Sequence, residues 1–163
     1  KIGYVDSSYL QSTVPGSNGN NANNNNNTVS TKANEVIAYA KTLLGKPYVW
    51  GAQGPNSFDC SGFVYYTFKK ADVGKKTVVR SSAQGQYASL KKYSVGKSMS
   101  NAKVGDIIFF SASGTTSGIN HVGIYAGGGK VVHAGSYRTG VCYGKISQLS
   151  NCGRKVCAIV RNV

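Results

Sequence analysis

The sequence predicts an α+β fold in which helices come first and an antiparallel sheet follows. Apolar residues recur at helical spacing in the first half of the chain, whereas the second half contains short strand-like apolar runs. Helices that precede the strands, rather than alternating with them, are typical of an α+β domain. A chain of 163 residues has room for one ordinary hydrophobic core.

Three helices are expected before the sheet. An apolar stripe predicts an amphipathic helix over residues 33–44, and Gly45 ends it. A second stripe begins at Cys60 and predicts a helix that ends near Gly74. A weaker pattern over residues 80–92 indicates a third helix.

Beyond the third helix the apolar period changes from that of a helix to that of a strand. The expected strands cover residues 106–110, 121–126, 130–134, 141–146 and 156–160. Their position after the helices favours an antiparallel sheet.

The N-terminal part of the chain differs in composition from the rest. Residues 18–27 contain eight asparagines and have no apolar period, so we expect residues 11–30 to form a flexible polar linker. The run Ile2–Val5 gives residues 1–10 strand character and resembles the last strand of a bacterial Src-homology-type cell-wall-binding barrel; the alternative is an unrelated strand or a disordered end. Residues 31–163 then form the main domain, and the chain is expected to be a piece of a longer, processed protein.

The net positive charge of the chain indicates which kinds of molecule it could bind. Lysine and arginine total 19 against five acidic residues, which gives a formal net charge of +14. A field of this sign favours a polyanionic partner, such as nucleic acid, an anionic membrane or an anionic cell-wall polymer. The lysines are scattered and no nucleic-acid reader motif is present, so we expect no nucleic-acid partner. No apolar run is long enough to cross a bilayer.

Cys60 stands at the start of the second expected helix, where a thiol can become a nucleophile. The thiolate is the attacking species, and the unpaired N–H groups and dipole of a first helical turn lower the pKa of a thiol. The same N–H groups can hold an oxyanion after a carbonyl is attacked. Ser61 and Gly62 are small and would let a substrate backbone approach, whereas Asp59 would cap the helix or point at a substrate ammonium.

The two histidines of the chain flank a run of glycines. Gly127–Gly129 lie between two strand-like runs and indicate a hairpin, because glycine permits positive φ. A three-residue loop places Gly123 opposite His133 and makes His121 the diagonal neighbour of His133, with Cα atoms about 7–8 Å apart on one face of the sheet. His133 can then orient the ring of His121 and leave its other nitrogen for Cys60.

A metal site is the rival interpretation of Cys60 and the two histidines. The chain has no close CxxC or HxxxH pair, so we expect neither a metal nor a cofactor. The other cysteines, Cys142, Cys152 and Cys157, allow one disulfide plus one free thiol or no disulfide at all, and small buried side chains are an equal alternative.

Five blocks of sequence together resemble the NlpC-type peptidoglycan cysteine peptidases. They are residues 44–52, 58–64, 105–110, 121–125 and 132–134. The blocks come in the family's order, and the resemblance covers residues 31–163. It implies a pared-down papain-like fold, in which a helix carrying the cysteine packs on a five- or six-stranded antiparallel sheet. It also implies cleavage of bacterial wall stem peptides, typically between D-γ-glutamate and a diamino acid.

The resemblance also implies the roles of the central residues. Cys60 matches the nucleophile, His121 the base, and His133 the third polar residue, which orients the base. The nearby Trp50 is expected to pack rather than to contact substrate. We expect a monomer that is secreted or held at the cell wall, where teichoic acids and peptidoglycan carboxylates supply anionic partners.

Other positions carry over from the family with alternatives left open. Tyr48 matches a tyrosine that lines the site and helps to bind the oxyanion; the alternative is a core aromatic. Asp59 and Ser61 match residues that hold the amino terminus of the stem peptide in some relatives. Arg80 and Ser81 match a segment that walls the cleft, where they would contact substrate carboxylates or the neighbouring Asp59; the alternative is a loop charge and a helix cap.

Two other functions fit the same residues. A papain-like amidase or acyltransferase would use the same triad on a different acyl group. A non-catalytic wall-binding module would keep the fold with a relic site. The intact set of Cys60, His121 and His133 favours an enzyme over such a module.

Overall fold

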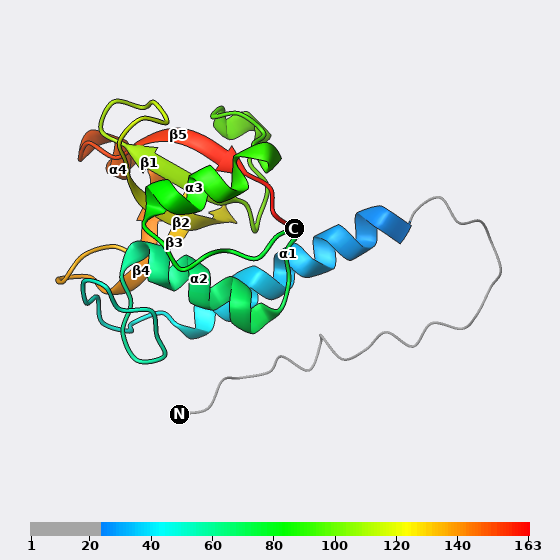
Figure 1. Ribbon diagram of the computed structural model, residues 1–163, viewed down its shortest axis with the longest axis horizontal. Coiled ribbons are helices and arrows are strands. Elements are labelled where there is room, and N and C mark those ends of the chain that lie inside the picture. The colour runs from blue at the N-terminus through cyan, green and yellow to red at the C-terminus, as the bar shows by residue number, and fades with distance from the viewer. Residues whose placement is uncertain (1–23) are drawn as a thin grey trace.

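Helices α1 to α3 cover one face of a five-stranded antiparallel sheet in the computed structural model, which describes residues 24–163 (Figure 1). The strand order is β4-β3-β2-β1-β5. The strands are β1 Ile107–Ser111, β2 Ile119–Gly127, β3 Lys130–Ala134, β4 Val141–Lys145 and β5 Lys155–Val160. The predicted α+β class is confirmed, while the barrel strand at residues 1–10 and the first part of the linker lie outside the described residues.

Strand β1 is central to the core because it is buried along its whole length. Ile107 and Phe109 pack into the main apolar cluster, which also holds the buried faces of α1, α2 and α3. Ile108 and Phe110 pack into a smaller cluster on the other face, together with Ile146 of α4. Burial on both faces explains why this strand reads as an unbroken apolar run rather than an alternating one.

The helices agree with the sequence pattern where an apolar stripe exists. Helix α2 spans Cys60–Ala71 and begins at the predicted residue, and α3 spans Ala83–Leu90 within the predicted range. Helix α1 spans Asn24–Thr42, so it begins well before residue 33 and takes in part of the expected linker. Thr28 and Ser30 are exposed, which leaves its first turns without an apolar stripe to detect.

The connection between β4 and β5 contains a helix that the sequence pattern does not reveal. Helix α4 spans Ile146–Asn151, at the point where the last residue of the predicted strand was placed. A helix of this length makes fewer than two turns, too few to repeat an apolar stripe. Ile146 is its buried residue and joins it to the smaller core cluster.

Strands β2 and β3 form a hairpin with the predicted register, but its turn differs from the predicted one. Gly127 pairs with Lys130, so the turn has two residues, Gly128–Gly129, with φ of 59° and 71°. A bulge just before Gly127 takes up the remaining residue, and Ile124 lies opposite Val132. The predicted three-residue loop is therefore wrong, but the alignment of the two strands at the histidines is the predicted one.

A buried ion pair ties the start of β1 to the C-terminal segment. Arg161 donates from Nε to Asp106 Oδ1 at 3.0 Å and from Nη2 to Oδ2 at 2.8 Å, and the side chain of Asp106 is fully buried. The backbone N–H of Lys103 also donates to Oδ2, at 2.8 Å. Within residues 24–163, no helix has the length and apolar character needed to cross a membrane.

Candidate active site

Helix α2 presents Cys60 at its first residue, partly exposed beside a cleft. Asp59 is the N-cap of this helix, because its Oδ1 accepts a hydrogen bond from the Gly62 N–H at 2.6 Å. The capping role predicted for Asp59 is thus confirmed. The cap holds the first turn in place and therefore sets the position of the thiol.

The residues expected to read the substrate form one hydrogen-bonded cluster around Asp59. Its Oδ2 accepts from the Gly51 N–H at 3.0 Å and from Arg80 Nη2 at 3.2 Å. Ser61 Oγ donates to Asp59 Oδ1 at 3.2 Å and accepts from Arg80 Nη1, also at 3.2 Å. The predicted contact between Arg80 and Asp59 is confirmed, and it joins the loop before α3 to the start of α2.

The serine that faces the cleft is Ser82 rather than the predicted Ser81. Ser82 is the N-cap of α3, with Oγ accepting from the Gly85 N–H at 3.2 Å, and it lines the cleft. Ser81 is not among the lining residues, and its side chain packs toward Gly85. The helix cap predicted at Ser81 is therefore one residue further along, at Ser82. Two adjacent serines have the same capping ability, so the sequence does not distinguish them.

The position of Gly62 requires a glycine because neighbouring protein atoms leave no room for a side chain. A Cβ built on Gly62 would collide with the carbonyl oxygen of Ala52 and would come within 2.9 Å of Asp59 Oδ1. Gly62 is buried, and Ser61 is only 3% exposed. The expectation that Gly62 admits the substrate backbone is therefore wrong, since protein atoms already occupy that space, whereas Ser61 lines the cleft.

The two histidines meet as the hairpin register predicts. His121 Nε2 and His133 Nδ1 are 2.7 Å apart, and the rings are nearly perpendicular at 82°. Both side chains are buried, and His121 borders the cleft beside Cys60. Since Nε2 of His121 is engaged by His133, Nδ1 is the nitrogen that remains for chemistry at the thiol.

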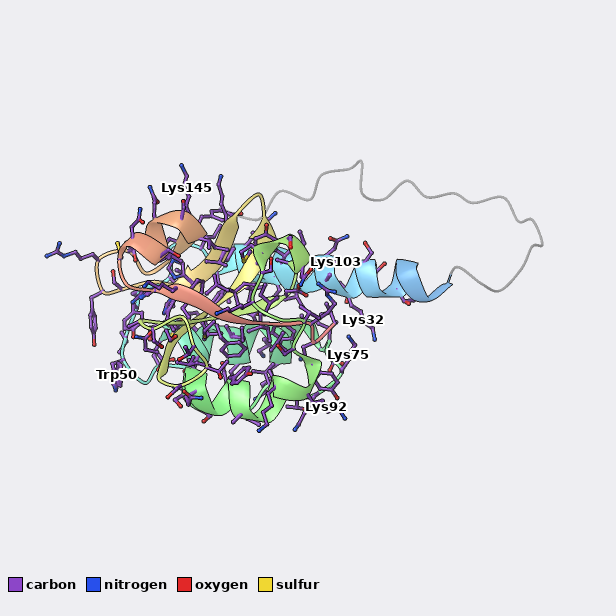
Figure 2. All side chains as sticks on the ribbon, turned by 90° about the horizontal axis from the view of Figure 1, so that it is seen from above. Lys32, Trp50, Lys75, Lys92, Lys103 and Lys145 are labelled. Atoms are coloured by element: carbon purple, nitrogen blue, oxygen red, sulfur yellow. The ribbon has the colours of Figure 1, made fainter. Side chains whose placement is uncertain are left out.

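A cleft of about 530 Å³ joins the candidate residues. Its lining residues are Tyr48, Trp50, Asp59, Cys60, Ser61, Arg80, Ser82, Ala83, Ile119, Asn120, His121 and Arg154. Trp50 is 79% exposed at the rim, so the expectation that it packs is wrong (Figure 2). It lies in the turn between α1 and α2, away from the core.

Tyr48 lines the cleft, as the family resemblance implies, and is also partly packed. Its ring meets that of Tyr137 edge-on, with centroids 5.0 Å apart. Burial, together with the nearby acidic groups of Cys60 and Asp59, raises the pKa of Tyr48. Its hydroxyl therefore stays protonated at neutral pH and can donate a hydrogen bond into the cleft.

Burial keeps the thiol and both imidazoles neutral at neutral pH. Burial and then the Asp59 carboxylate raise the pKa of Cys60, against the smaller opposing effect of the Ser61 and Val122 backbone N–H groups. Burial lowers the pKa of His121 well below its ordinary value and lowers that of His133 to about 4. The expected depression of the Cys60 pKa is therefore wrong for the free protein, because desolvation outweighs the N–H groups of the helix start.

Arg154 is a cleft residue that the sequence analysis missed. Both terminal nitrogens of its guanidinium donate to the carbonyl of Gly135, each at 3.3 Å, and the side chain lines the cleft. Its positive charge lowers the pKa of Cys60 and of both histidines. Arg154 directly precedes β5, distant in sequence from Cys60, and no local motif marks it.

All four cysteines are free thiols. Of the two predicted possibilities, one disulfide plus a free thiol or no disulfide, the structure has no disulfide. Cys157 is buried and donates to the Phe109 carbonyl at 3.3 Å, whereas Cys152 is exposed. Cys142 is partly exposed and lies on β4. In the part of the chain that the structure describes, no three His, Cys, Asp or Glu side chains are grouped so as to hold a metal ion.

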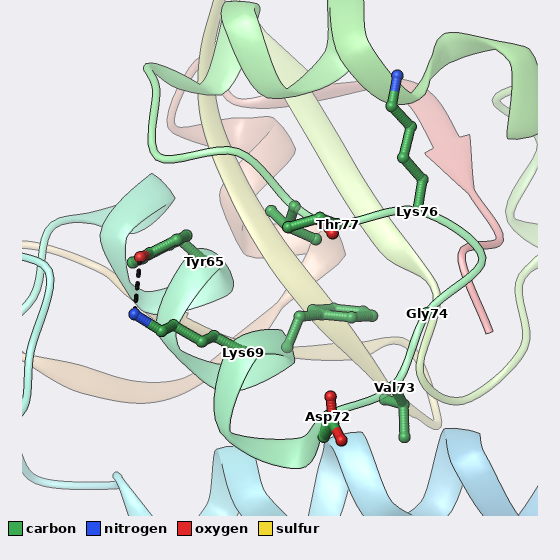
Figure 3. Close-up of a pocket in the computed structure, with 9 residues that line it drawn as sticks. Tyr65, Lys69, Asp72, Val73, Gly74, Lys76 and Thr77 are labelled. Atoms are coloured by element: carbon green, nitrogen blue, oxygen red, sulfur yellow. Dashed lines mark hydrogen bonds between the residues drawn. The ribbon is translucent and has the colours of Figure 1, made fainter.

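A second cavity, of about 300 Å³, lies at the other end of α2 (Figure 3). It is bordered by Asp72, Gly74 and Thr77, and Lys69 Nζ donates to the Tyr65 hydroxyl at 3.2 Å on its wall. None of the candidate site residues lines it. The chemistry suggested by the sequence therefore belongs to the cleft at Cys60.

The chain is similar to a known protein family and to named proteins. The model of the NlpC/P60 family matches residues 45–156. The chain is 41% identical over 123 residues to a probable endopeptidase p60 of Listeria grayi, a match that covers 76% of this chain and 22% of that relative. It is 38% identical over 122 residues to the probable peptidoglycan endopeptidase LytE of Bacillus subtilis, covering 75% of this chain and 31% of the relative. The chain thus spans less than a third of either relative.

A solved structure agrees over the whole domain. The NlpC/p60 domain of the peptidoglycan hydrolase SagA superposes with a TM-score of 0.63 at 29% identity. The match covers 78% of this chain and 97% of that domain. With the family model extending over most of the described residues, the chain belongs to the NlpC/P60 family.

Proposed function

We propose that this protein is a cysteine peptidase that cleaves the stem peptides of bacterial peptidoglycan, with Cys60 as the nucleophile. The observation that carries the proposal is the 2.7 Å contact between His121 and His133 beside the helix-start Cys60 in an open cleft. This arrangement is that of a nucleophile, a base and a group that orients the base. The relatives named above as peptidoglycan endopeptidases and hydrolases supply the substrate class.

The proposed mechanism begins from a neutral thiol and a neutral imidazole. His121 accepts the Cys60 proton at Nδ1, and the thiolate attacks the scissile carbonyl. The new imidazolium then gives its proton to the leaving amine as the C–N bond breaks, which leaves an acyl thioester on Cys60. His121 next takes a proton from water, the hydroxide attacks the thioester, and the thiol is regenerated.

The oxyanion of each tetrahedral intermediate is stabilised by donors that are already in place. The backbone N–H groups of Ser61, at the start of α2, and of Val122, on β2, interact with the Cys60 sulfur and lower the pKa of its thiol. The same donors favour negative charge on an attacked carbonyl oxygen. The protonated hydroxyl of Tyr48 is a further donor at the cleft wall.

The cleaved bond is proposed to lie between D-γ-glutamate and a diamino acid. A γ-linked glutamate keeps its α-carboxylate free, and the cleft presents cationic Arg80 and Arg154. Asp59 supplies the opposite charge for a stem amino terminus, although its two oxygens already accept four hydrogen bonds. The cluster of Asp59, Ser61 and Arg80 would therefore act as one preformed unit.

Product analysis tests the reaction and separates it from the alternatives. Defined muropeptides would be digested with the full chain and the products identified by mass spectrometry. The proposal expects a fragment that ends in D-γ-glutamate and another that begins with the diamino acid. Release of the whole peptide from the glycan would indicate an amidase, and products carrying an added amine would indicate an acyltransferase; either result overturns the proposed bond.

We further propose that the protein is secreted and that its positive charge holds it near anionic wall polymers. The formal charge of +14 is large for its size. Lys32, Lys75 and Lys92 lie on the side of the folded domain away from Trp50 (Figure 2). Attraction of an anionic polymer to that side would leave the cleft open for a stem peptide.

A further inference from the structure

Cys142 lies directly beside the histidine that orients the proposed base. In the pairing of β3 with β4, His133 and Cys142 are opposite one another, so their side chains share a face of the sheet. The Cys142 sulfur is 3.7 Å from His133 Nε2. A continuous row of groups therefore runs from the cleft to β4: His121, His133 and Cys142.

Two glycines, which have no side chain, lie beside the outer edge of the His133 ring. A Cβ built on Gly144 would come within 2.6 Å of Nε2, and one built on Gly135 within 3.4 Å. His133 is only 3% exposed, so its ring nitrogens need partners inside the protein. Among the residues that the structure describes, the hydrogen-bond partner of Nε2 is the Cys142 sulfur.

The tautomers of the two histidines decide whether His121 can act as a base. A neutral imidazole carries one proton, and burial keeps both rings neutral. If His121 donates from Nε2 to His133 Nδ1, then His121 Nδ1 is bare and can accept the Cys60 proton. If His133 donates instead, the proton of His121 must sit on Nδ1, and His121 cannot serve Cys60.

The first arrangement requires His133 to carry its proton on Nε2, where it meets Cys142. An imidazole N–H is a stronger donor than a thiol S–H, and sulfur can accept. Because Cys142 is partly exposed, its S–H can turn toward solvent while its lone pairs face Nε2. The sulfur then completes a one-way chain of hydrogen bonds that ends at a bare nitrogen beside Cys60.

We propose that Cys142 is a positioning residue, which accepts a hydrogen bond from His133 Nε2 and so selects the tautomer in which His121 Nδ1 is free to take the Cys60 proton. The effect of Cys142 on the rate of cleavage rests on the proposed peptidase function, whereas its effect on the histidine tautomers does not depend on that function. Cys142 therefore acts through two other residues and touches no substrate.

Side-chain nitrogen NMR of the full chain reads the tautomers directly. The chain contains only two histidines, so long-range ¹H–¹⁵N spectra show two ring systems, which a His133→Gln variant assigns. The wild-type protein is expected to have protonated Nε2 and bare Nδ1 in both rings at neutral pH. In Cys142→Val, which keeps a strand-forming side chain but has no lone pair, the His133 and His121 signals should shift toward a tautomer mixture. Cys142→Ser, which restores an acceptor, should recover part of the wild-type pattern.

Kinetics with the same variants provide the second measurement. Cys142→Val should lower kcat roughly tenfold with KM nearly unchanged, because it disturbs proton transfer and not binding. Cys152→Ser, at an exposed thiol that is not among the cleft-lining residues, should match the wild type in both measurements.

The NMR result stands whether or not a peptidase activity is found, so failure of the proposed function can be told apart from failure of this inference. A wild-type His133 protonated at Nδ1 would overturn the role of Cys142. Unchanged histidine signals in a folded Cys142→Val protein would overturn it equally, even if kcat fell.

Discussion

Arg154 places a guanidinium within electrostatic reach of a thiol and two imidazoles. Removing this charge should raise the pKa of Cys60 and also raise those of the two histidines, because a cation favours the thiolate and disfavours the imidazolium. We expect Arg154→Gln to move the midpoint of Cys60 alkylation by iodoacetamide to higher pH, as followed by mass spectrometry of the Cys60 peptide. Arg138→Gln, at an exposed loop arginine, is the matched control. A midpoint that stays in place in Arg154→Gln would show that its charge does not act on the thiol.

The burial of His133 couples folding to pH. Its pKa is lowered from 6.5 to about 4, so between these values the unfolded chain binds a proton that the folded protein does not. Stability is therefore full above the unfolded pKa and falls as the pH drops through this window, by on the order of 3 kcal/mol for this residue. Urea unfolding from about pH 7 to about pH 4 should show the loss, and His133→Gln should show a shallower slope. Equal slopes for the two proteins would contradict the assignment.

The contacts of a residue could be predicted where strand pairing determines them. Its pKa shift could not be predicted where burial in the folded protein determines it. The contact of His121 with His133 follows from strand periodicity and one hairpin. The direction of the Cys60 pKa does not, because desolvation depends on elements that meet only in the folded chain. Arg154 lies just before β5 and lines the cleft, and Trp50 lies outside the core. No local sequence pattern predicts either position.

At the scale of elements, the start of α2 is packed too tightly to tolerate a larger residue. An added methyl at Gly62 would meet the Ala52 carbonyl and Asp59, so the helix or its capping loop would have to move. We expect Gly62→Ala to lower the free energy of unfolding by about 2 kcal/mol and to reduce cleavage, since Cys60 shifts with the helix. Denaturant unfolding and a digestion assay check both effects. Lys70→Ala, on the exposed side of the same helix, should leave the position of the thiol unchanged, and equal behaviour of the two variants would refute the packing argument.

Elements with a long apolar stripe or a run of strand residues were predictable, and short or polar ones were not. Helix α2 and strand β3 match their predicted starts, whereas α4 is too brief to show a period. The first turns of α1 escaped notice because their described side chains face solvent. The β2–β3 turn was mistaken because a bulge plus a two-residue turn uses the same number of residues as a three-residue loop.

For the whole molecule, the excess of positive charge predicts wall binding that depends on salt. Screening shortens from about 8 Å at physiological ionic strength to about 3 Å at 1 M, so retention by teichoic-acid-bearing walls should fall steeply over this range. Pelleting of a Cys60→Ala protein with purified walls measures binding without digestion. Walls stripped of teichoic acid serve as the control and should retain less. Retention that is the same at both salt concentrations would contradict electrostatic attachment.

The central claim is that Cys60 performs the cleavage, and Cys60→Ala tests it most directly. The variant and the wild-type chain would be compared on purified peptidoglycan, with soluble fragments measured by mass spectrometry and folding checked by circular dichroism. The substitution removes the nucleophile but leaves the Asp59 cap and the histidine pair in place. We predict a folded protein that releases no stem-peptide fragments, whereas fragment release at the wild-type rate would contradict the mechanism.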